Sequence, residues 1–241
     1  AEFEVSQDLN YVTGLQNSYN WSTMEWLNYE FWPRLKAGIG AGAGYTKVSD
    51  NSGSGFSNPD FVNEQLQGRL NWRATDKLSI QTSAGFEEQQ FMAAGYGDSL
   101  NPIFRASIQY QPFQWTLIYF SAARTVSSSD YYISAQSSEI TTVSLNLNQR
   151  LFVKYNLNLG IAYNTTDYTS TLSAPGISTN TERSDNGCVF SASIGRNFLN
   201  HGNWAINYQY NDNQSSVAGY GQQSSQIGFQ VGFKLLQDGV E

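Results

Sequence analysis

The chain has 241 residues, of which 40% are hydrophobic, 15% aromatic and only 14% charged. An average soluble domain has about 25% charged residues, so the polarity of this chain comes instead from Asn, Gln, Ser and Thr. The many aromatic residues exclude a disordered chain, and no run approaches the ~18 apolar residues of a membrane-spanning helix. Plentiful Thr, Val, Tyr and Ser favour strands over a helical bundle.

The charged and reactive residues exclude several kinds of site. A net charge of −7 leaves no basic stripe to bind phosphates, so we expect no nucleic-acid partner. Cys188 is the single cysteine and His201 the single histidine. A disulfide within the chain, a thiolate metal cluster and a two-histidine metal site are therefore excluded, and we expect no metal or other cofactor.

Hydrophobic residues recur with a period of two along most of the chain. From Trp204, for example, Trp204, Ile206, Tyr208 and Tyr210 alternate with small or amide residues. Successive side chains of a strand point to opposite faces, so each such segment has one apolar and one polar face. We predict about twelve strands, at residues 2–11, 21–32, 35–47, 61–73, 77–91, 102–111, 114–126, 139–152, 155–168, 187–198, 203–212 and 225–236.

The predicted connections alternate in length. Short turns fall near Pro33, Thr75, Pro112, Lys154 and His201. Long polar connections, rich in Ser, Asn, Gly and Asp, cover about 49–60, 93–101, 127–138, 169–186 and 212–225, after a first one near 11–20. An even number of strands with short turns on one side and long loops on the other is typical of a transmembrane β-barrel.

A soluble β-sandwich would show the same alternation, but with its apolar faces buried between two sheets. Three features favour the barrel. Many segments alternate for ten residues or more, which suits a tilted crossing of a bilayer. A sandwich has no reason to keep the asymmetry of loop length. Aromatic residues also fall beside the short turns, as an interfacial girdle requires: Trp32, Trp72, Trp115, Tyr155 and Trp204.

Several segments resemble the outer-membrane β-barrel porins of Gram-negative bacteria. They are EFWPRLKAGIGAGAGY, GRLNWRATDKLSIQTSAGF, SLNLNQRLFVKYNLNLGIAY and QIGFQVGFKL. The resemblance lies in the general sequence pattern over most of the chain and not in a sharp motif. It implies an antiparallel barrel in the bacterial outer membrane, with short periplasmic turns and long extracellular loops. Some relatives are linked to exopolysaccharide export. The chain departs from the common aromatic ending, so we assign 1–236 to one barrel and 237–241 to a short tail.

If the apolar faces meet lipid, the polar faces line the lumen. The predicted pore-lining residues are Arg69, Arg105, Arg124, Arg150, Lys234, Glu30, Glu87, Gln67, Gln109, Asn146, Asn148, Asn207, Gln209 and Gln230. Amides both donate and accept hydrogen bonds, so such a lining suits neutral hydrophilic solutes such as saccharides. Alternatively, the amides hydrogen-bond across a closed and filled barrel.

The inward charges also allow two interpretations. Opposed Arg and Glu side chains would create a transverse field that screens solutes, or they would pair as salt bridges that brace the wall.

Two further segments stand out. Between 114 and 126 both faces are apolar, and we assign Ile118 and Phe120 to the inside, against an inward-folded loop or a local plug. The row Gly38, Gly40, Gly42 and Gly44 predicts a place where the wall bends, the bore widens or a bulky neighbouring side chain is received.

The sequence favours a channel or an export conduit over the other function classes. Hydrolytic triads need a positioned imidazole or a carboxylate pair, and Glu87 and Glu88 point to opposite faces, so we expect no enzyme. We expect a channel for small hydrophilic solutes, saccharides and exported polysaccharide included. The alternative is a closed barrel that acts as a structural or surface-interaction module, for instance within a larger envelope complex. Expected partners are outer-membrane lipid, lipopolysaccharide, a polar solute and envelope proteins.

Overall fold

A computed structural model describes residues 2–5, 17–49, 59–93, 97–128, 136–152, 154–170, 183–198 and 202–233. These residues form twelve strands. The strands are β1 (Glu2–Val5), β2 (Asn17–Trp32), β3 (Leu35–Ser49), β4 (Phe61–Thr75), β5 (Leu78–Phe91), β6 (Ser99–Phe113), β7 (Thr116–Ser128), β8 (Gln136–Leu151), β9 (Tyr155–Ser170), β10 (Arg183–Phe198), β11 (Gly202–Ser215) and β12 (Gln222–Phe233).

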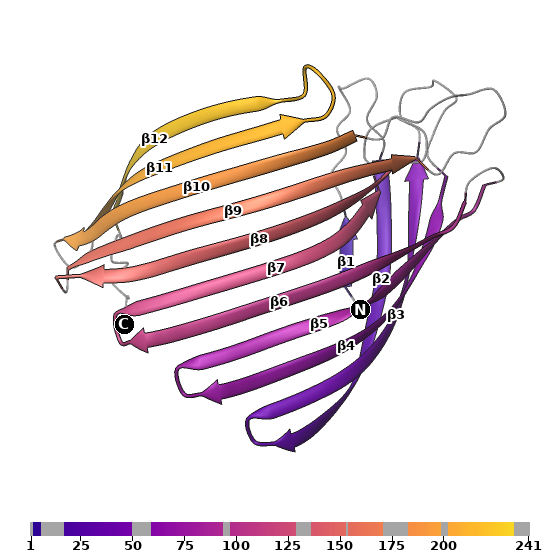
Figure 1. Ribbon diagram of the computed structural model, residues 1–241, viewed down its shortest axis with the longest axis horizontal. Coiled ribbons are helices and arrows are strands. Elements are labelled where there is room, and N and C mark those ends of the chain that lie inside the picture. The colour runs from indigo at the N-terminus through magenta and orange to yellow at the C-terminus, as the bar shows by residue number, and fades with distance from the viewer. Residues whose placement is uncertain are drawn as a thin grey trace, which may run out of the picture.

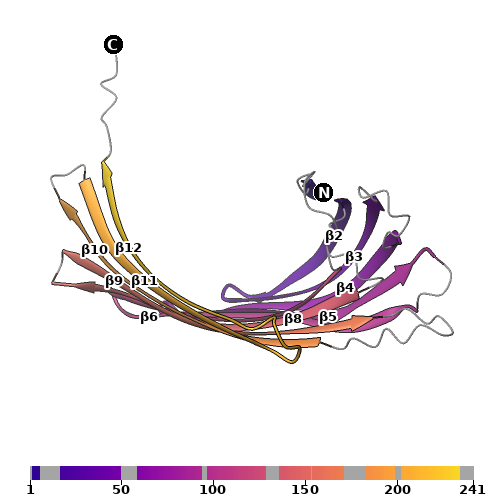
Figure 2. The same cartoon turned by 90° about the horizontal axis from the view of Figure 1, so that it is seen from above.

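All twelve strands belong to one antiparallel sheet in which each pairs with its neighbours in sequence, from β1 to β12 (Figure 1). Seen from above, the sheet curves into a trough (Figure 2). In the described part of the chain, β1 and β12 are the two edges of this sheet. The architecture is therefore a strongly curved wall of twelve strands.

The strands predicted from the sequence are confirmed in number and order. Ten of them lie within a few residues of the expected bounds, and most are longer, because the ladder continues into the polar residues at the long-loop end. The exceptions are β1, which ends at Val5 with 6–11 outside the described residues, and β12, which runs from Gln222 to Phe233 rather than from 225 to 236. Register shifts interrupt the ladder beside three short turns, for example between Glu30 and Trp32.

One face of the sheet carries the apolar residues, and they are exposed. Leu27 is 73% exposed, Ile161 50% and Phe229 70%. Among the described residues only Phe61 and Ile103 are buried hydrophobic side chains, and their places in the register put both on the other, polar face. A soluble sandwich would bury the exposed set between two sheets, so this outer face is built to contact lipid.

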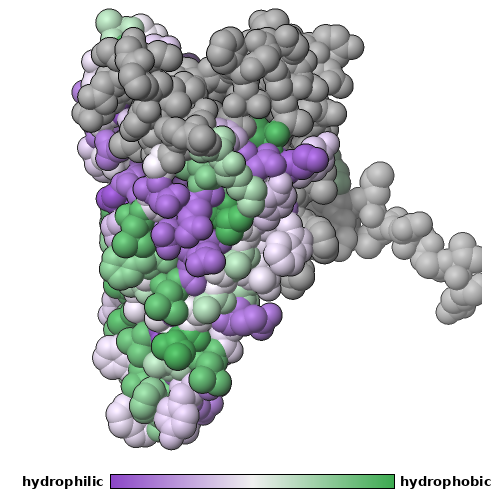
Figure 3. Space-filling view, turned by 90° about the vertical axis from the view of Figure 1, so that its right-hand side faces the viewer, coloured by the Kyte–Doolittle hydropathy of each residue, from purple (hydrophilic) through white to green (hydrophobic). Residues whose placement is uncertain are grey.

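The apolar surface is not uniform along the strands. Viewed from the side of β2 to β4, hydrophobic residues gather toward the short-turn end, and hydrophilic ones toward the long-loop end (Figure 3). Strands of 14 to 16 residues exceed the 9–11 that a tilted crossing needs. The strands therefore continue beyond the apolar band at the long-loop end.

Aromatic side chains mark both ends of the apolar band. Trp21 and Trp32 lie eleven residues apart on the outer face of β2, 45% and 65% exposed. Eleven residues cover about 36 Å of strand, which at a tilt of ≈45° gives a height of about 26 Å, close to the ≈25 Å of an outer-membrane band. At the short-turn end the rings of Tyr155 and Trp204 lie 6.4 Å apart. Trp32, Tyr155 and Trp204 therefore agree with the expected girdle, whereas Trp115 does not, because its ring lies 4.8 Å from the guanidinium carbon of the inner Arg150.

None of the described residues forms a helix long and apolar enough to cross a membrane.

Candidate functional site on the inner face

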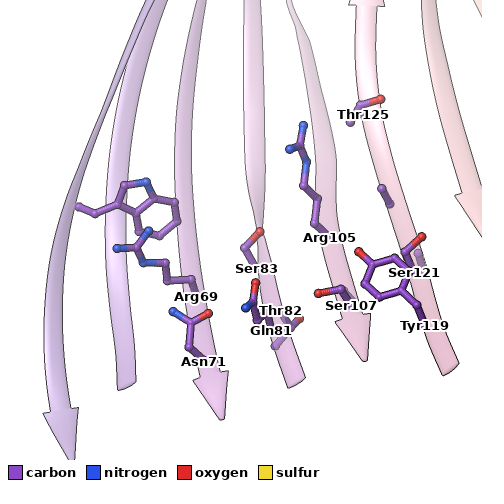
Figure 4. A pocket seen from close by; sticks show the side chains of 14 residues that line it. Arg69, Asn71, Gln81, Thr82, Ser83, Arg105, Ser107, Tyr119, Ser121 and Thr125 are labelled. Atoms are coloured by element: carbon purple, nitrogen blue, oxygen red, sulfur yellow. The ribbon is translucent and has the colours of Figure 1, made fainter. Parts of the chain in front are cut away.

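The polar side chains lie on the concave face of the trough, called here the inner face. A hollow of about 470 Å³ lies on this face between β2 and β7. Its lining includes Trp26, Arg69, Asn71, Gln81, Ser83, Arg105, Ser107, Tyr119, Ser121 and Thr125 (Figure 4). The register explains why these residues meet, because antiparallel pairing places Arg69, Ser83 and Arg105 opposite one another across three strands.

Arg69 is held in a fixed position within the hollow. Its guanidinium carbon lies 4.2 Å from the centre of the Trp26 ring, and its Nε donates a hydrogen bond of 2.8 Å to Oδ1 of Asn28. A guanidinium over an indole face is attracted by the ring quadrupole. Both contact partners lie on β2, whereas Arg69 itself lies on β4. The cation is therefore held above the backbone of β3, the strand between them.

The glycine row on β3 makes that arrangement possible. A Cβ atom at Gly40 would lie 2.7 Å from the Trp26 ring, and one at Gly38 would lie 2.5 Å from Oδ1 of Asn28. Side chains of β2 therefore lie across β3 toward β4 in the space that the glycines leave open. The prediction that this row receives a bulky neighbour is confirmed.

Arg105 flanks the same hollow from β6. Ser83 lies between Arg69 and Arg105 in the register, so the two backbone positions are about 10 Å apart, twice the ≈4.8 Å strand spacing. Within the described residues neither arginine forms a salt bridge. Two cations thus face the hollow without a carboxylate at their side.

The inner carboxylate Glu87 lies further toward the long-loop end and is occupied by amides. Its Oε2 accepts a hydrogen bond of 2.7 Å from Gln65, and its Oε1 one of 2.9 Å from Gln89. Gln67 in turn donates to Gln65 at 2.9 Å. Glu87 and Gln89 are 6% and 2% exposed, so this network forms a buried, hydrogen-bonded patch above the hollow.

Two other inner carboxylates are paired with cations. Glu30 accepts Nζ of Lys36 at 2.8 Å near the short-turn end. Asp185 accepts Arg183 at 2.7 Å near the long-loop end. The guanidinium of Arg183 also lies 4.1 Å from the Tyr168 ring and 4.4 Å from the Tyr220 ring. From the sequence, the inner charges could either pair as salt bridges or stay unpaired and create a field across the lumen. The described inner face contains both paired charges and charges without a salt bridge.

Most of the predicted lumen residues share the inner face. The register places twelve of the fourteen there: Arg69, Arg105, Arg150, Glu30, Glu87, Gln67, Gln109, Asn146, Asn148, Asn207, Gln209 and Gln230. Only Arg69 and Arg105 line the hollow; the others are spread along the strands. Lys234 lies outside the described residues.

The prediction for Arg124 was wrong. Arg124 pairs with Phe104, whereas the inner Arg105 pairs with Ala123, so Arg124 points to the outer face. There it forms a salt bridge with Glu139 near the long-loop end of β7 and β8. Alternation in β7 is too weak to fix its facing from sequence, because apolar residues occupy both parities.

The same weakness reversed the assignment of two neighbours. Ile118 and Phe120 lie on the outer face, while Leu117 and Tyr119 lie on the inner one. Tyr119 then lines the hollow, and no plug is needed to explain an apolar inner pair. The inner position of Trp26 was also missed, because polarity does not alternate there: Met24 and Trp26 lie on the inner face and Glu25 on the outer one.

Among the described residues, no group of three or more His, Cys, Asp or Glu side chains is placed to hold a metal ion. The groups that face the hollow are guanidinium, amide, hydroxyl and aromatic. Such groups bind by hydrogen bonding, charge and stacking.

Comparison with solved structures places the fold. The chain resembles a mutant of the ferric enterobactin receptor PfeA from Pseudomonas aeruginosa, with a TM-score of 0.57 and 14% identity over 94% of this chain. It also resembles PfeA in complex with BCV-L6, with a TM-score of 0.54 and 14% identity over 91% of this chain. The chain spans 40% of the length of each receptor.

Sequence comparisons add no closer relative. No protein-family model matches the sequence. No curated protein matches it either.

The fold, the exposed apolar face and the aromatic girdle agree with one another. The matched part of each receptor has a fold similar to that of this chain, and the apolar outer face of the chain needs lipid rather than water. The chain is the antiparallel strand wall of an outer-membrane β-barrel, and its location is the bacterial outer membrane.

Proposed function

We propose that this wall lines a channel that passes small hydrophilic solutes of saccharide type across the outer membrane. The observation that carries the proposal is the inverted burial: large apolar residues are exposed on the outer face, and amides and hydroxyls cover the concave one. A concave polar face beside an apolar convex one encloses water rather than lipid.

The inner face can replace the hydration shell of an uncharged solute. Across β8 to β11, one row of the register contains four amides and hydroxyls: Asn148, Asn158, Ser193 and Asn207. Within that row Asn158 donates to Ser193 at 3.0 Å. Amides and hydroxyls both donate and accept, so they can hydrogen-bond sugar hydroxyls without requiring a charge.

Planar-bilayer recording tests this proposal. The full chain, refolded in detergent and inserted into a bilayer, should give stepwise ohmic conductance, and a neutral sugar should reduce it in a concentration-dependent way. Absence of any conductance step from correctly folded protein would contradict the proposal and favour a closed, structural barrel. Folding is checked independently by heat-modifiable migration on detergent gels.

Export of a polysaccharide is the second function that the lumen would serve. The resemblance to porins linked with exopolysaccharide export supports it. A deletion strain should then lose surface polysaccharide while uptake of small sugars persists. Loss of uptake with intact surface polysaccharide would instead assign the chain to solute entry.

A further inference from the structure

We propose that the hollow between β2 and β7 is a binding site for an acidic saccharide, with Arg69 and Arg105 holding its carboxylate. This goes beyond the proposed function, which was argued for uncharged saccharide-type solutes, and it rests on that function only for access through the lumen.

The distribution of charged side chains around the hollow favours the binding of an anion. Arg69 and Arg105 flank Ser83 in one row, and three inner carboxylates are engaged elsewhere. Glu30 binds Lys36, Asp185 binds Arg183, and Glu87 accepts two amides. Guanidinium groups bind carboxylates through two parallel hydrogen bonds. Among the described residues, the hollow is therefore a part of the inner face where two arginines lie without a salt bridge to a carboxylate.

The two arginines are prepared for different parts in binding. Stacking on Trp26 and the bond to Asn28 fix the guanidinium of Arg69, so it loses little freedom when a ligand binds. Arg105 lines the same hollow from β6, and its side chain extends along that strand (Figure 4). A carboxylate between the two side chains would accept hydrogen bonds from Arg69, a donor fixed on the β2 side, and from Arg105, a donor that can turn toward it.

The next row of the register supplies the groups that a sugar ring needs. Asn71, Gln81, Ser107 and Ser121 lie side by side across β4 to β7, directly beside the arginine row. They line the same hollow. A ring whose carboxylate lies between the arginines would place its hydroxyls against these amides and hydroxyls. The chemistry of the two rows together is that of a uronic acid.

Two probes of matched size test the site. A trisaccharide of glucuronate and one of glucose differ only by a carboxylate in place of a hydroxymethyl group on each ring. Isothermal titration of the full chain in detergent micelles reads binding without any need for conductance. We expect the glucuronate trisaccharide to bind at least about tenfold more tightly, since a hydrogen bond to a charged group is worth roughly a factor of ten.

Variants locate the binding. R105Q should weaken binding of the acidic trisaccharide about tenfold and leave the glucose trisaccharide unaffected. R105K keeps the charge but loses the two-pronged geometry, so it should recover only part of the affinity. The matched control is R196Q, which removes the same charge from the outer face, where Arg196 lies 5.4 Å from the Tyr155 ring.

The outcomes separate this site from the proposed function. Equal binding of the two trisaccharides, or an unchanged affinity in folded R105Q, would overturn the site whether or not the protein conducts. Tight, Arg105-dependent binding by a protein that never conducts would support the site and contradict the channel. Conductance that the acidic trisaccharide blocks in wild type but not in R105Q would support both.

Discussion

The guanidinium of Arg69 on β4 lies over the indole of Trp26 on β2, two strands away, with only glycine backbone between them. The contact exists because Gly40 leaves no side chain beneath the ring. It joins three features that the sequence shows separately: a glycine row, an inward aromatic residue and an inward cation. Together they shape one side of the hollow.

Replacing Gly40 by Ala should therefore disturb this side of the hollow. The new Cβ would lie 2.7 Å from the Trp26 ring, and such overpacking costs about 1–3 kcal/mol. We expect a lower free energy of unfolding, measured by urea titration in lipid vesicles. G228A is the control, because a Cβ there meets nothing within 4 Å; equal losses in both variants would show that Trp26 does not depend on the glycine.

A charge placed on the outer face should destabilise the protein far more than one on the inner face. Leu145 and Asn146 are neighbours on β8 at the same depth, and Leu145 is 46% exposed on the outer face. L145R should lower the free energy of unfolding in vesicles by about 2–4 kcal/mol, the cost of Arg facing the bilayer core. N146R should lower the free energy of unfolding much less. A larger loss in N146R than in L145R would show that the inner and outer faces are assigned the wrong way round.

The outer salt bridge of Arg124 and Glu139 should be measurable as a coupling. Their side chains are 30% and 19% exposed, so removing one partner would leave the other charge unpaired on the outer face. We expect a double-mutant cycle with R124Q and E139Q to give a coupling within about 0.5–3 kcal/mol. Additive effects would indicate that the two groups do not interact, and a change of ion selectivity in R124Q would place Arg124 inside the lumen after all.

Reversal of a charge on the inner face should change the ion selectivity of the lumen, whereas reversal of a charge on the outer face should not. Arg150 lies on the inner face near the short-turn end, 4.8 Å from the Trp115 ring. If the lumen conducts, R150E should shift the reversal potential in a salt gradient toward cation selectivity, because a fixed charge at a constriction screens ions. R196E makes the same change on the outer face, and a shift of equal size there would contradict the facing of both residues.

Much of the fold follows from the sequence because alternate residues of a strand point to opposite faces, so the two faces can be read from the alternation of polar and apolar residues. Where alternation is strict, as from Trp204 to Tyr210, the facing of each residue was predicted correctly, whereas the register with the neighbouring strands was not predicted. Where it fails, in β7, Arg124, Ile118 and Phe120 were placed on the wrong face, since the polarity of single residues could not decide between two apolar parities. Only pairing with β6 and β8 settles it.

The hollow itself could be predicted only in part. Arg69 and Arg105 were recognised as inward cations, but their neighbourhood depends on which residues of β4, β5 and β6 lie opposite one another. A shift of two residues in one strand would keep the same inward set and separate the arginines. The contact of Arg69 with Trp26 also spans a strand without side chains, which no pattern within one strand can reveal.

Spin labels along β11 test the orientation of the wall most directly. With Cys188 replaced by Ser, single cysteines at Ile206, Asn207, Tyr208 and Gln209 would carry the label in vesicles. The account predicts that labels at 206 and 208 collide mainly with oxygen dissolved in lipid, and those at 207 and 209 mainly with a water-soluble nickel complex. Labels with the opposite preference, or with no alternation between neighbouring positions, would contradict it.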